Sequence, residues 1–229
     1  MKLTVAIIVA ALAVLLGPVV WQFATYKPQS VPSSGLPWQI ETLPGGEAQV
    51  FGLTLGRSTL ADARARFGTE MQLAVIAEPG EDGNVEGYYE SVTAGFVAGK
   101  LIVTAELSPE LIAGMRERAP KTQYMQSTTR RATLAPADEA AALAAPIRGL
   151  AFIPGAQLDE AVILERFGQP AERIRVNAHQ EHLLYPGKGL DLVLDSKGRE
   201  LLQYVAPARF EALRAPLLAQ AAGGKPDKP

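Results

Sequence analysis

Two stretches of this chain, about one hundred residues apart, carry nearly the same pattern of glycine, apolar and charged residues. The first covers residues 50–68 and the second residues 150–170, and both contain Arg-Phe-Gly near the end. Downstream of each, a glycine turn, an apolar run and a segment that opens with proline follow in the same order. Two separated matches in one order favour the duplication of a folding unit. With only two copies, we expect paired domains and not a solenoid.

Seven residues define the repeated motif. They are Gly56, Phe67 and Gly68 in the first copy and Gly155, Phe167, Gly168 and Pro170 in the second. Gly68 and Gly168 each follow an amphipathic segment and precede an apolar run, so we expect both to end a helix in the left-handed conformation.

Apolar periodicity and capping residues predict helices before Gly68 and Gly168, after Ser108, over residues 136–145 and around residues 210–217. Pro216 is expected to bend or shorten the last of these. Strands are predicted at residues 72–77, 88–93, 101–105, 172–176, 181–185, 190–194 and 200–205. In the run 190–194 the leucines should face the core, and the face that holds Asp191 should be partly wet.

The predicted fold class is therefore α+β, with an N-terminal transmembrane helix followed by two similar helix–antiparallel sheet–helix domains. The predicted segments are a transmembrane anchor (1–27), a linker (28–46), the first repeat (47–119), a connector (120–149), the second repeat (150–218) and a disordered tail (219–229).

The membrane anchor is predicted from residues 3–24, which carry no charge. As a helix this run spans roughly 33 Å at about 1.5 Å per residue, against a hydrocarbon core of about 30 Å. Trp21 and Tyr26 stand at its far end, where an interfacial aromatic belt would lie. We expect a single-pass protein of the bacterial inner membrane with its soluble domains in the periplasm. A cleaved signal peptide is the alternative.

The motif residues, followed by glycine turns at Gly99 and Gly198, resemble a known envelope pattern. The order is similar to that of the fold shared by the outer-membrane assembly lipoprotein BamE and the secreted β-lactamase inhibitor protein, which carries the unit in tandem. This chain has no cysteine, so it lacks both the lipid-bearing cysteine of the first and the disulfide of the second. Inhibition of a β-lactamase is therefore not carried over. The resemblance implies a non-catalytic, extracytoplasmic binding scaffold.

Composition excludes several function classes. Without cysteine the chain cannot form disulfides, thiolate metal sites or a thiol nucleophile. A formal net charge of −2 and the lack of a basic cluster give no electrostatic case for nucleic acid. No nucleophile elbow, phosphate-binding loop or dinucleotide fingerprint occurs, and no cofactor is predicted.

The polar candidates all have a simpler structural interpretation. His179 and His182 are the only histidines, and at i and i+3 in a strand they point to opposite faces, so we predict no metal site. Asp159 and Glu160 could be paired carboxylates, but first-turn helix charges explain them better. An acidic cluster around a Pro-Gly turn matches no EF-hand spacing and is interpreted as a solvated loop; its members are Glu78, Glu81, Asp82 and Glu86. Surface charges are expected at Arg57, Arg64, Arg66, Arg130 and Arg131.

These observations predict a non-catalytic interaction or assembly module of the bacterial envelope, bound to the membrane through residues 3–24 and to another envelope protein. A small-ligand sensor with a pocket between the repeats is the alternative. An exposed apolar groove would favour a protein partner, and a closed pocket with convergent polar groups would favour a ligand.

Overall fold

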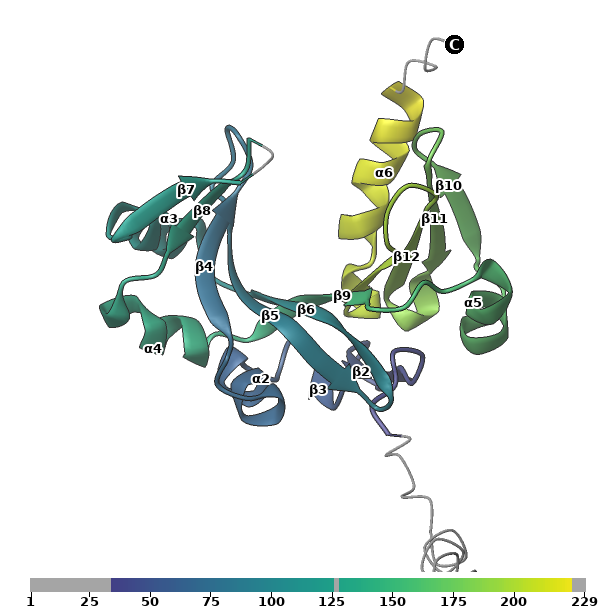
Figure 1. Cartoon of the computed structure of the whole chain (residues 1–229), viewed down its shortest axis with the longest axis horizontal. Coiled ribbons are helices and arrows are strands. Elements are labelled where there is room, and N and C mark those ends of the chain that lie inside the picture. The colour runs from purple at the N-terminus through teal and green to yellow at the C-terminus, as the bar shows by residue number, and fades with distance from the viewer. Residues whose placement is uncertain (1–33, 126–127, 224–229) are drawn as a thin grey trace, which may run out of the picture. The chain divides into compact units, whose positions relative to one another are not determined.

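Ten strands form one antiparallel sheet (Figure 1). The computed structural model describes residues 34–125 and 128–223, which belong to one compact unit. Across the sheet the strands are β10 (Glu172–Arg175), β11 (Gln180–Tyr185), β12 (Leu190–Asp195), β13 (Leu201–Val205), β9 (Ile147–Pro154), β6 (Val97–Ala105), β5 (Asn84–Ala94), β4 (Gln72–Ala77), β8 (Arg130–Thr133) and β7 (Lys121–Tyr124). A small second sheet holds β1 (Glu41–Thr42), β2 (Ala48–Val50) and β3 (Leu53–Thr54).

The predicted fold class is wrong, because the two copies share one ten-stranded sheet and do not form two separate helix–sheet–helix domains. Strand β9 pairs with β6 on one side and with β13 on the other, so that Phe152 stands between Leu101 and Leu202. Unpaired strand edges invite association, and β9 closes the inner edges of both meanders at once. The first copy supplies a three-stranded meander (β4–β6) and the second a four-stranded one (β10–β13).

The described α-helices lie where predicted, except that the last one runs beyond residue 217 into the segment predicted as a disordered tail, residues 219–229. They are α2 (Leu60–Phe67), α3 (Pro109–Glu117), α4 (Pro136–Ala144), α5 (Glu160–Phe167) and α6 (Glu211–Gly223). Pro216 was expected to bend or shorten the last helix, and the shortening is wrong, since α6 continues through this residue. Leu213 and Leu217 on either side of Pro216 pack on a common apolar cluster, which holds the helix together.

None of the helices within residues 34–125 and 128–223 is long and apolar enough to cross a membrane. The run in which we expected an anchor, residues 3–24, lies outside the described part of the chain.

The two faces of the sheet are covered differently. Alternate strand residues, among them Leu101, Phe152 and Tyr204, face the main core, to which α2, α3, α4 and α5 contribute side chains. On the opposite face α6 packs over the second meander, where Phe210 joins Ile174 in a separate apolar cluster. Figure 1 shows α6, in yellow, beside β10, β11 and β12. The first meander has no described helix on this opposite face.

The segment predicted as a linker packs onto the sheet from residue 36 onward. Leu36 is buried, and the Tyr204 hydroxyl donates a 3.0 Å hydrogen bond to the carbonyl oxygen of Pro37. The Trp38 ring contacts Phe96 of the first copy and Phe167 of the second, at centroid distances of 5.9 and 6.3 Å. These residues therefore fasten the two copies together.

One strained residue sits under the centre of the sheet. Phe51 has a φ of 55° and joins Gly52, at 75°, in the two-residue turn between β2 and β3. Hairpin turns of this length favour positive φ at both positions, which normally selects small or polar residues. Phe51 is tolerated because its ring is buried against Phe152 and Tyr204, at 5.3 and 5.4 Å.

Candidate functional site

The repeated motif builds the same packing unit twice. In the first copy the Phe67 ring lies 5.9 Å from Tyr89, whose hydroxyl donates to the carbonyl oxygen of Gly68 at 3.3 Å. In the second copy the Phe167 ring lies 6.2 Å from Tyr185, whose hydroxyl donates to Gly168 at 3.0 Å. Burial raises the pKa of both tyrosines. Each unit fixes the end of a helix onto the core face of its meander.

The two glycines that end these helices have positive φ, as predicted, but they are not left-handed helical residues. Gly68 has φ 100° and ψ 173°, and Gly168 has φ 82° and ψ −172°. This combination is accessible essentially to glycine alone. The expectation of a left-handed cap is therefore wrong, because the chain turns directly into extended backbone.

The other motif glycines tie one copy to the other. The backbone N–H of Gly56 donates to the carbonyl oxygen of Ile147 in β9, and that of Gly155 donates to Ala98 in β6, both at 2.8 Å. Pro170 is half-buried after α5. The motif residues are thus structural and do not converge on one surface site.

A groove lies on the face of the sheet that α6 covers only in part. It has a volume of about 660 Å³. Its floor comes from both copies, with Asn84 and Thr104 from the first and Ala151 and Gln203 from the second, and its wall is the start of α6 near Leu213. Next to it the alternate residues of β5, β6 and β9 stay half-exposed. We call this surface the open face; it comprises Asn84, Glu86, Tyr88, Ile102, Thr104, Arg148 and Ala151.

The open face carries both a carboxyl with a raised pKa and an exposed guanidinium. Glu86 stands opposite Thr104 in β6, and burial raises its pKa from 4.5 to about 7 although the Arg148 charge opposes the rise. Arg148 is exposed and donates to the Asn84 amide oxygen at 2.6 Å. At neutral pH Glu86 is therefore only partly ionised, and Arg148 is incompletely neutralised. The sequence interpretation of Glu86 as part of a solvated loop is wrong, because it lies in β5.

A buried polar chain runs from this groove under α6. The Nδ1 atom of His182 lies 2.9 Å from Oδ2 of Asp191, and the Gln203 amide donates to the same oxygen at 3.4 Å. Asp191 is 1% exposed, so the expectation of a wet face around it is wrong. The reason is α6, which covers that face of β12 and whose position local periodicity does not give.

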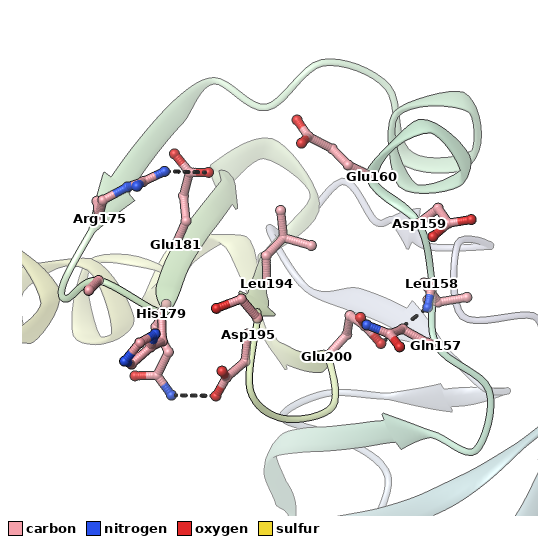
Figure 2. A pocket seen from close by; sticks show the side chains of 13 residues that line it. Gln157, Leu158, Asp159, Glu160, Arg175, His179, Glu181, Leu194, Asp195 and Glu200 are labelled. Atoms are coloured by element: carbon pink, nitrogen blue, oxygen red, sulfur yellow. Dashed lines mark hydrogen bonds and ion pairs between the residues drawn. The ribbon is translucent and has the colours of Figure 1, made fainter.

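A second, more polar pocket of about 340 Å³ lies beside α5 (Figure 2). It holds Asp159, Glu160 and His179 together with residues of the turn from β12 to β13. His179 is half-buried at the pocket whereas His182 is buried against Asp191, so the two histidines do not converge. In the described part of the chain no cluster of three or more His, Asp and Glu is arranged to hold a metal ion.

The remaining acidic candidates do not gather into a site. Glu78 accepts a 2.6 Å hydrogen bond from Thr129, while Glu81 and Asp82 offer only backbone carbonyls to Arg116.

Of the arginines, Arg57 pairs with Glu47 and Arg131 donates to Gln72. Arg66 lies over the Phe67 ring, 5.6 Å from its centroid. Arg64 and Arg130 are partly buried, so the expectation of surface charge is too simple for them.

Sequence reasoning missed Arg148, Asp191, Gln203 and Glu200. The charge of Asp191 between two leucines was a signal of an unusual polar residue in a strand. No sequence pattern marked Arg148, because it lies in the segment interpreted as a connector. In comparisons with known proteins, no family model, no curated protein and no solved structure matches this chain.

Proposed function

We propose that this chain is a non-catalytic protein-interaction module of the bacterial envelope that binds its partner at the open face. The observation that carries the proposal is the asymmetry of the sheet. On the face opposite the main core, the second meander lies under α6, whereas the first meander carries no described helix. Tyr88 and Ile102 are half-exposed on this uncovered sheet face. They give a binding partner an apolar area that polar residues surround.

The charges of the open face define the partner's chemistry. Arg148 has the Asn84 amide as its hydrogen-bond partner, and the nearby Glu86 carboxyl is partly protonated at neutral pH. The guanidinium therefore favours a carboxylate from the partner, because a charge-assisted bidentate contact is stronger than its present bond to an amide. The proposed occupant is a partner segment that places an Asp or Glu on Arg148 and apolar side chains on Tyr88 and Ile102.

Site-specific photo-crosslinking tests this proposal. A benzoylphenylalanine introduced at Tyr88 of the full chain in intact cells should give one discrete adduct, and Arg148→Glu in the same protein should abolish it. Tyr124, an aromatic residue that is 77% exposed at the edge strand β7, is the matched control and should not give that adduct. An adduct that survives Arg148→Glu, or no discrete adduct at Tyr88, would refute binding at the open face.

A small-ligand sensor is the second candidate, favoured by one observation. The groove is lined by both copies, and its volume falls in the range of roughly 300–1,000 Å³ typical of ligand sites. Thermal-shift screening with small carboxylic acids distinguishes the two candidates. Stabilisation that depends on Arg148, without a protein adduct, would favour the sensor.

The envelope location belongs to the same proposal and rests on the uncharged run over residues 3–24. A phosphatase reporter joined after Pro229, which is active only outside the cytoplasm, should be active. An inactive phosphatase, with activity instead from a reporter that requires the cytoplasm, would move the module to the cytoplasmic side.

A further inference from the structure

The polar pocket beside α5 has an excess of carboxylates (Figure 2). Two of its acidic residues already have cationic partners. Glu160 pairs with Arg173 at 2.7 Å, and Glu181 lies 3.7 Å from Arg175. Asp195 and Glu200 have no ion pair with any described residue. The pocket therefore presents negative charge that the described part of the protein leaves unbalanced.

Glu200 is an unusual member of this group because its side chain is buried. The residue is only 3% exposed, and its Oε2 atom accepts a 3.2 Å hydrogen bond from the backbone N–H of Leu158. The other carboxyl oxygen has no partner among the described residues, and Glu200 lines the pocket. Burying a carboxylate is costly unless a cation or several hydrogen bonds compensate it. The second oxygen is not among the fully buried polar atoms that lack a partner, so this oxygen is the part of the carboxylate that stays open to a cation in the pocket.

Asp195 is held at the other end of the same turn. Its carboxyl accepts hydrogen bonds from the backbone N–H of Lys197 at 2.9 Å and from the Gln180 amide at 3.0 Å. These bonds lower its pKa and orient the group. Figure 2 shows Asp195 and Glu200 on the two arms of the turn that joins β12 to β13.

We propose that this pocket binds an ammonium group on an alkyl chain, with the Glu200 carboxylate at its inner end and Asp195 beside the entrance. A volume of about 340 Å³ accommodates such a group with part of its chain. The ammonium has three donors and no acceptor, which suits a site of carboxylate oxygens. The same chemistry is presented by a free diamine and by a lysine side chain of a partner protein. The site is distinct from the open face and does not depend on the function proposed for it.

The test is a titration of the full-length ¹⁵N-labelled protein in non-ionic detergent, followed by its amide NMR spectrum. The two probes are putrescine and N-acetyl-lysine methylamide, with sodium chloride and propionate as controls for ionic strength and charge sign. We expect saturable shifts at the amides of Leu158, Ser196 and Glu200 with at least one amine, and none with propionate. Putrescine binding more tightly indicates a free amine, and the lysine derivative binding more tightly indicates a partner side chain.

Variants decide whether the carboxylates are responsible. Glu200→Gln should weaken amine binding at least tenfold and Asp195→Asn by several-fold. The control Glu165→Gln should leave binding unchanged, because that residue is exposed on α5 and does not line the pocket. If Glu200→Gln does not fold, Asp195→Asn carries the test. Shifts that sodium chloride reproduces, or equal amine affinity in the carboxylate variants and in the wild type, would overturn the proposal.

Discussion

The hydroxyl of Tyr185 donates a 3.0 Å hydrogen bond to the carbonyl oxygen of Gly168, and Tyr89 makes the equivalent bond to Gly68 at 3.3 Å. A net contribution of about 1 kcal/mol is typical of one such bond. We expect Tyr185→Phe to lower the free energy of unfolding by about that amount, and Tyr89→Phe by no more, because its bond is longer. Urea denaturation measures both, and Tyr124→Phe, at an exposed residue, should be neutral. A neutral Tyr185→Phe would show that the bond contributes nothing.

The backbone of Gly168 gives a second prediction. A Cβ added there meets no atom within 4 Å, so the cost of Gly168→Ala is purely conformational. With φ 82° and ψ −172°, alanine should cost about 1–3 kcal/mol. Gly187→Ala is the matched control, since it is equally open and its φ is not positive. Equal thermal stability of the two variants would contradict the strained geometry.

Glu86 predicts how stability changes with pH. Its pKa is about 7 in the folded protein against 4.5 ordinarily, so the folded state binds this proton more tightly. The stability that comes from this tighter proton binding is fully present below about pH 4.5. It is lost as pH rises from about 4.5 to 7, and the free energy of unfolding falls by about 3 kcal/mol in total. Glu86→Gln should remove that fall and be the more stable protein at pH 8. Urea denaturation across this range measures it. Glu70→Gln, at an exposed site, should keep the wild-type profile, and a profile unchanged by Glu86→Gln would contradict the burial effect.

The shared strand predicts one unfolding transition for both copies. Phe152 of β9 is fully buried between Leu101 and Leu202, so Phe152→Ala should cost about 3–5 kcal/mol. Calorimetry should show the single transition moving as a whole, with equal calorimetric and van't Hoff enthalpies. Val162→Ala, at a partly exposed site on α5, should change stability by less than about 1 kcal/mol. Two resolved transitions would mean that the copies fold independently.

Local signals in the sequence were sufficient for the helices and for most strands. The Phe-Gly ends of α2 and α5, the capped start of α3 and the leucine run of β12 all depend on neighbours in sequence, and they lie where predicted. The failures are long-range. Nothing near residue 150 indicates that β9 pairs with two meanders, and nothing near Asp191 indicates that α6 covers it. Glu86 and Arg148 come from strands that are not neighbours, and the charge of Arg148 still acts on the pKa of Glu86; no motif spacing describes this proximity.

Among the described residues, β9 is the only strand that joins the two meanders in the ten-stranded sheet, so it also determines how this protein can misassemble. If β9 leaves β6 while it remains on β13, one molecule exposes two complementary strand edges. Each exposed edge can pair with the complementary edge of a second molecule, β9 of one molecule with β6 of the other, so a reciprocal dimer regenerates every pairing of the original sheet. At high protein concentration and near the unfolding midpoint, the chain should therefore convert to a domain-swapped dimer, with the segment between α4 and β9 as its hinge.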